Sequence, residues 1–132
     1  MNFLSSLLNN VKTLIVSDLQ LTSPTGSPYY AEYIFTEEPL LVIVVNAKIR
    51  GLGGTDNSGN NRYTNYPVSA VLSKGGYYEL EPSMQAGSSW PGPPTASLSS
   101  DGLVLRTNTG WSSMDYSAYK AATCNYRIIH YN

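Results

Sequence analysis

The sequence predicts an all-β fold, a single antiparallel β-sandwich or jelly roll that follows a short N-terminal helical or extended segment. Seven or eight short stretches rich in β-branched and aromatic residues follow one another with turn-forming residues between them. Helical periodicity is confined to the first residues, and no internal repeat of useful period is visible. A chain of 132 residues is long enough to bury the core of one domain without disulfides.

Residues 1–28 are interpreted as an assembly segment and linker, and residues 29–132 as the β-sandwich domain. Apolar residues in the first segment recur at three- and four-residue steps, which favours a short helix that yields to a strand. The β-branched run 13–16 could equally begin a strand that reaches Leu21. Four residues hold coiled-coil spacing and are candidate interface residues: Leu4, Leu8, Val11 and Ile15. No basic region precedes this segment, so we expect no signal-directed export.

The stretch 40–50, LLVIVVNAKIR, is the strongest strand in the sequence and follows a strand in YYAEYIF. Regular alternation places Leu41 and the odd-numbered residues up to Ile49 on one apolar face. The other face begins with Leu40, Val42 and Val44 and then becomes polar. Because that half-apolar face needs cover, we expect these three residues to pack beneath the N-terminal segment or against another subunit.

The rest of the chain alternates turns and strands. Residues 51–61, GLGGTDNSGNN, are expected to form a long exposed loop. Gly75 and Gly76 separate two strand-like stretches and predict a tight hairpin. Asp101 and Gly102 mark another turn, and TCNYRIIHY forms a closing strand.

The residue types that catalyse reactions are sparse, so we expect no enzymatic activity. The single histidine, His130, is near the end of the last strand, where a surface position is expected. Cys124 shares its strand face, but six residues of strand separate the two by about 20 Å. The Asn-rich loop that contains Asp56 lacks the later glutamate of a calcium loop. Neither a metal site nor a cofactor is therefore expected.

Charge also narrows the choice of partners. The net charge is −1, and the 8 lysines and arginines are scattered singly along the chain. Nucleic acids are bound by clustered basic residues, so no nucleic-acid partner is expected. No apolar stretch reaches the length of a membrane-spanning helix, so membrane insertion is not expected either.

Aromatic and amide side chains in the loops are the candidate ligand-binding groups. Sugars stack their apolar faces on such rings while amides bind their hydroxyls, so a host glycan is a possible partner and a carbohydrate-binding module or lectin is the alternative function. Structural plugging of the sandwich ends by the two tryptophans is an equally good explanation. The candidate ligand-binding residues are Tyr63, Tyr66, Trp90, Trp111, Tyr116, Asn60 and Asn61.

The chain contains an apolar N-terminal segment, the stretch YIFTEEPLLVIVVNAKI, Gly/Asn-rich loops and the closing stretch CNYRIIHYN. In this architecture and composition it resembles small bacteriophage virion proteins, namely the trimeric β-sandwich heads of tail fibres and the capsid decoration proteins. The resemblance implies a homotrimer that binds other virion proteins, is assembled in the host cytoplasm, and serves in receptor recognition or capsid decoration. It identifies no binding residue. The short stem departs from fibre proteins, so the chain would dock on another virion protein or act as a capsid cement.

Overall fold

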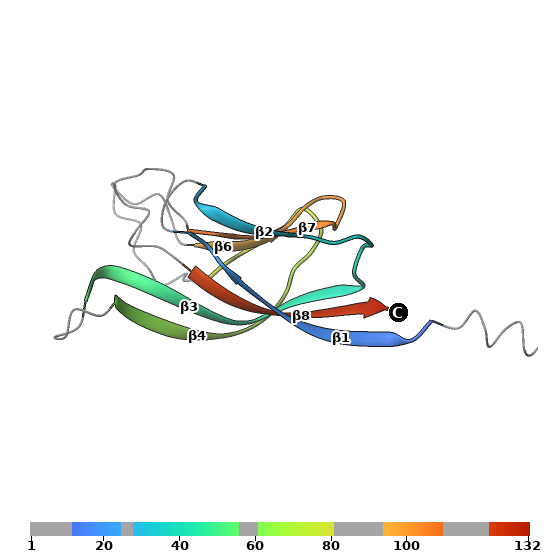
Figure 1. Ribbon diagram of the computed structural model, residues 1–132, viewed down its shortest axis with the longest axis horizontal. Helices are drawn as coiled ribbons and strands as arrows, with labels where there is room; N and C mark the ends of the chain where they lie inside the picture. Colours follow the sequence, from blue (N-terminus) through green and yellow to red (C-terminus); the bar gives the residue numbers. More distant parts are fainter. Residues whose placement is uncertain (1–11, 25–27, 56–60, 81–93, 110–121) are drawn as a thin grey trace, which may run out of the picture.

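The computed structural model describes residues 12–24, 28–55, 61–80, 94–109 and 122–132. Within these ranges the chain forms eight strands in two antiparallel four-stranded sheets that pack face to face, without a helix (Figure 1). The predicted all-β antiparallel sandwich is confirmed. The helical spacing considered for the N-terminus extends from Phe3 to Ile15. Its last two residues, Leu14 and Ile15, lie in a strand, and residues 1–11 lie outside the described residues.

The first sheet has the strand order β1-β8-β3-β4 and the second the order β2-β7-β6-β5. The first sheet consists of β1 (Leu14–Thr22), β8 (Ala122–Tyr131), β3 (Leu41–Thr55) and β4 (Asn61–Val71). The second consists of β2 (Tyr30–Ile34), β7 (Val104–Asn108), β6 (Thr95–Leu98) and β5 (Tyr77–Glu79).

Strand β1 is an edge strand of the first sheet. It pairs with β8 over its whole length, from Leu14 opposite Tyr131 to Thr22 opposite Thr123. The β-branched run near its start therefore begins a strand, as one of the two sequence interpretations proposed. Residues 14–22 belong to the sandwich itself, while a role of residues 1–28 in assembly stays a prediction.

The predicted faces of β3 are wrong for its first half, because the strand contains a bulge. Val44 pairs with Tyr126 and Asn46 pairs with Asn125, so Val45 is one extra residue relative to β8. A bulge of this kind shifts the alternation by one position. Val42 and Val44 are 1% and 0% exposed and lie in the core, so they need no second subunit to cover them.

The core lies between the sheets and includes a polar contact that joins them. Apolar residues of β3, β8, β6 and β7 fill the interior. At its centre, Tyr126 of β8 and Thr107 of β7 share a hydrogen bond of 2.6 Å, and both residues are buried. This contact fixes the two sheets to each other at one point.

Both glycine-containing turns contain a glycine with positive φ, but only one of them connects paired strands. Gly75 has a φ of 73°, and the amide of Gly76 donates to the carbonyl of Ser73 at 2.9 Å. The predicted hairpin is nevertheless wrong, because β4 and β5 belong to different sheets and this turn carries the chain between them. The turn at Gly102, with a φ of 76°, does connect the paired strands β6 and β7.

The expected loop at 51–61 is shorter than predicted. Strand β3 continues to Thr55 and β4 begins at Asn61, where the two residues pair. The backbone pairing of a long hairpin therefore extends into a stretch whose composition alone indicates a loop.

Candidate binding sites

The structure does not bring the described members of the predicted ligand-binding set together. Tyr63 and Tyr66 are three residues apart on β4, so they point to opposite faces of the first sheet. Tyr63 is exposed with Lys48 Nζ 5.2 Å from its ring centroid, whereas Tyr66 packs against the core. Asn61 is the first residue of β4. The other predicted residues lie outside the described residues: Asn60, Trp90, Trp111 and Tyr116.

The described members of the predicted interface set are also separated. Ile15 is half-buried and pairs with His130. Leu40 is exposed, whereas Val42 and Val44 are core residues. The remaining three lie outside the described residues: Leu4, Leu8 and Val11.

A different apolar surface is present on the outward side of the first sheet. Val16 lies opposite Ile129, which in turn lies opposite Leu41, so these three form a row across β1, β8 and β3. Ile43 and Val71 continue the surface onto β4. We call the following set the outer apolar face: Leu14, Val16, Leu41, Ile43, Val71, Ile129 and Tyr131.

Several side chains of the outer apolar face are well exposed to solvent. Leu14, Val16 and Val71 are 58%, 60% and 58% exposed. The same side of the sheet becomes polar further along, where Asp18 pairs with Arg127 at 3.2 Å. An apolar patch bordered by polar residues is typical of a protein interaction surface.

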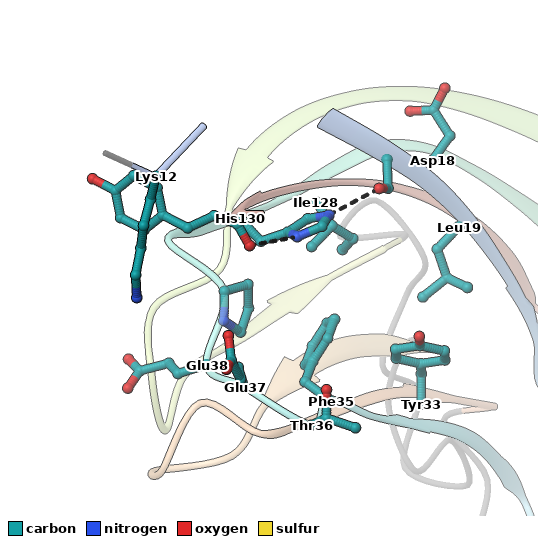
Figure 2. A pocket seen from close by; sticks show the side chains of 13 residues that line it. Lys12, Asp18, Leu19, Tyr33, Phe35, Thr36, Glu37, Glu38, Ile128 and His130 are labelled. Atoms are coloured by element: carbon teal, nitrogen blue, oxygen red, sulfur yellow. Dashed lines mark hydrogen bonds between the residues drawn. The ribbon is translucent and has the colours of Figure 1, made fainter. Parts of the chain in front are cut away.

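A cleft of about 500 Å³ lies on the side of the sandwich where the edge strands β1 and β2 face each other (Figure 2). Residues of β1 and β8 form one wall, and residues of β2 and the connection from β2 to β3 form the other. We call it the inter-sheet cleft. Its lining residues are Lys12, Ser17, Asp18, Leu19, Tyr33, Phe35, Thr36, Glu37, Glu38, Pro39, Ile128, His130 and Tyr131.

Tyr33 and Phe35 form an aromatic wall of the inter-sheet cleft. Tyr33 pairs with Leu105, a fully buried residue, so both side chains point toward the interior. Tyr33 is nevertheless 43% exposed, because the sandwich is open at this side. Phe35 contacts it edge to face, with ring centroids 5.1 Å apart and planes at 68°. The pair offers an apolar surface to a molecule in the cleft.

His130 faces these rings from the other wall (Figure 2), and Ser17 lines the cleft beside it. His130 Nε2 lies 3.0 Å from Ser17 Oγ, and its Nδ1 lies 3.4 Å from the carbonyl oxygen of Tyr131. His130 is half-buried near the end of β8 and lines a cleft that opens to solvent, a position that the sequence-based expectation of a surface histidine does not specify. Sequence reasoning missed Ser17, Tyr33 and Phe35 as site residues, because only strand pairing brings them near His130.

The charged residues of the cleft nearly balance. The carboxylate of Glu38 forms an ion pair with Lys74, and that of Asp18 with Arg127. Two further charges line the cleft, the carboxylate of Glu37 and the ammonium of Lys12, whose Nζ lies 5.9 Å from the ring centroid of Tyr131. The three carboxylates of the lining are therefore matched by three cations only when Lys74 and Arg127, which lie outside the lining, are counted with Lys12.

Cys124 lies away from both surfaces and is buried in the core. Burial raises the pKa of its thiol to about 11, and burial likewise raises the pKa of Tyr126. A protonated thiol is a poor nucleophile and a poor metal ligand. The described residues contain no group of three or more His, Cys, Asp or Glu side chains placed to hold a metal ion.

In the part of the chain that the structure describes, no helix is long and apolar enough to cross a membrane. Comparisons of the sequence and the structure with models of protein families, with curated proteins and with solved structures find no match.

Proposed function

We propose that the protein is a non-enzymatic structural protein of a bacteriophage virion, a trimeric β-sandwich that serves in receptor recognition or capsid decoration. One observation carries the assembly part of this proposal, the outer apolar face of the first sheet. The bacteriophage setting is supported by the resemblance in architecture and composition to virion proteins of this size.

The apolar character of the outer apolar face is better explained by a partner that covers it than by a contribution to the core of the single chain. Leu14, Val16 and Val71 contribute little to the core of the single chain, since more than half of each side chain is exposed. Full burial of a fully exposed side chain of this size contributes roughly 1.5 to 3 kcal/mol, and these residues can still gain the part that corresponds to their exposed fraction. Burial of several of them in one contact therefore favours association and offsets part of the entropy lost on binding.

The partner that we propose for this face is the N-terminal segment of a neighbouring copy. Residues 1–11 contain six large apolar side chains and end directly before Lys12, at the border of the outer apolar face. A stretch of 11 residues spans at most roughly 35 to 40 Å, and four paired strands are about 15 Å across. The segment is therefore long enough to cross the sheet of an adjacent subunit.

Sedimentation equilibrium of the full chain tests the assembly. We expect the mass of three chains for the unaltered protein and the mass of one chain for Val16→Lys, because a charge on this face is costly to bury. A chain without residues 1–11 should also be monomeric, and this truncation leaves every described strand in place. The matched control is Gln20→Lys, which adds the same charge to the polar end of the same strand and should remain trimeric.

A monomeric unaltered chain would contradict assembly, as would a Val16→Lys variant that still associates. The virion setting is tested separately by the neighbouring genes. Genes for capsid or tail proteins on either side would support it, and an operon of metabolic enzymes would count against it.

A further inference from the structure

We propose that the inter-sheet cleft is a binding site for a neutral monosaccharide or disaccharide, with Tyr33 as the stacking ring and Ser17, His130 and Glu37 as the groups that bind its hydroxyls. This inference does not depend on assembly through the outer apolar face. The lining of this cleft does not include Tyr63 or Tyr66, the two described aromatic residues that composition indicates.

The aromatic wall suits the apolar side of a sugar ring. Carbohydrates present C–H groups on one face of the ring, and such faces pack on aromatic side chains. Tyr33 is held by its strand and by the edge-to-face contact with Phe35, so little conformational entropy is lost when a ligand packs on it. Its hydroxyl adds a hydrogen-bonding group beside the apolar surface.

The opposite wall suits hydroxyl groups in particular. Ser17 Oγ and His130 Nε2 share a hydrogen bond of 3.0 Å, and the tautomer of the imidazole decides which of the two groups donates in it. The hydroxyl of Ser17 can form a further hydrogen bond to a ligand, and the Nε2 atom can exchange its partner for a ligand hydroxyl. Sugar hydroxyls both donate and accept hydrogen bonds. The carboxylate of Glu37 is an acceptor that can bind two adjacent hydroxyls, and none of the ion pairs found among the described residues involves it.

Charge and size define the ligand further. Lys12 and Glu37 offset each other in the lining, and the other two carboxylates have cationic partners. An acidic sugar would bring a like charge near the Glu37 carboxylate, and a basic sugar would bring one near the Lys12 ammonium. A neutral sugar therefore fits best. The volume of about 500 Å³ lies within the roughly 300 to 1,000 Å³ of small-molecule sites, and the open side admits the end of a longer glycan.

The test is a titration of the ¹⁵N-labelled full chain with a panel of neutral methyl glycosides and disaccharides, followed by NMR. We expect at least one sugar to shift the amide signals of residues that line the cleft. Tyr33→Ala should weaken its binding about tenfold, since an aromatic contact of this kind contributes that much. Ser17→Ala and Glu37→Gln should each weaken it several-fold.

Two matched control variants test whether the loss of binding is specific to the cleft. Tyr77→Ala removes an exposed tyrosine of β5, and Ser69→Ala removes an exposed hydroxyl of β4; both positions lie outside the cleft lining and should leave binding unchanged. Glu37 is exposed and lies outside the strands, so Glu37→Gln reports on binding even where Tyr33→Ala does not fold.

Three results would overturn the proposal. The first is a panel in which no neutral sugar shifts the cleft signals. The second is binding that persists unchanged in both Tyr33→Ala and Glu37→Gln, which would place the sugar elsewhere. The third is tighter binding of a uronic acid or an amino sugar than of its neutral parent, which would show that charge selects the ligand.

Discussion

At the scale of single residues, the contact between Thr107 and Tyr126 is the most informative. Each hydroxyl is buried, and each belongs to a different sheet, so the hydrogen bond of 2.6 Å both satisfies two polar groups and sets the position of one sheet on the other. A buried polar group that loses its partner is costly, because water cannot replace the bond.

Removal of the Tyr126 hydroxyl should therefore destabilise the fold. We expect Tyr126→Phe to lower the free energy of unfolding by roughly 1 to 3 kcal/mol, because the buried Thr107 hydroxyl then keeps only its hydrogen bond to the Cys124 thiol, a weak partner. Urea denaturation followed by circular dichroism measures this change. Tyr77→Phe, at a tyrosine that is 68% exposed, is the control and should have no effect. Equal stability of the two variants would mean that Thr107 finds another partner.

The buried thiol makes stability depend on alkaline pH. Burial raises the pKa of Cys124 from 9.0 to about 11, so the folded state disfavours the thiolate. This contribution is fully present below pH 9 and is lost as the pH rises from about 9 to about 11. The loss is on the order of 2 to 3 kcal/mol, and ionisation of Tyr126, whose pKa is also raised, adds to it.

Urea midpoints measured between neutral and alkaline pH test this dependence. The unaltered chain should lose stability in that range, and Cys124→Ala should lose less of it, since only the tyrosine contribution remains. An identical decline in both proteins would show that the thiol does not contribute. Thiol reagents at neutral pH should also modify the native protein far more slowly than the unfolded chain.

At the scale of elements, β3 shows which features of a strand can be predicted from its apolar residues and which cannot. Its existence and most of its length are predictable, because a run of β-branched residues strongly favours a strand. Its faces are not, because the extra residue Val45 is visible only in the pairing with β8. A partner expected over Val42 and Val44 was thus a consequence of the missed bulge. The apolar face that does require explanation is on the other side of the sheet.

The two glycine turns can be compared directly by substitution. Both have positive φ, which costs an alanine about 1 to 2 kcal/mol. An added Cβ at Gly75 would lie 3.7 Å from the nearest atom, whereas at Gly102 it would lie 3.0 Å from Cγ of Glu38, whose carboxylate is paired with Lys74. We therefore expect Gly102→Ala to destabilise the protein more than Gly75→Ala. Thermal unfolding of the two variants measures the difference, and a greater loss for Gly75→Ala would contradict this explanation.

At the scale of the whole molecule, the fold class follows from local patterns, whereas the inter-sheet cleft does not. Turn residues and alternation act over a few positions, so a sequence displays them directly. The cleft depends on Ser17 and His130, which are 113 residues apart and meet only because β1 pairs with β8. Residue types alone give no reason to join them, and Tyr63 and Tyr66, the two described aromatic residues of the predicted set, point to opposite faces of the sheet.

The position of β8 within the first sheet also determines when the sandwich can form. It lies between β1 and β3, yet it follows the seven other described strands in the chain. During synthesis, β1 and β3 would leave the ribosome without the strand that joins them, and their apolar sides would stay accessible to chaperones until β8 emerged. Closure of the first sheet is therefore a late event with long loops to close, and we expect this part of the chain to fold slowly.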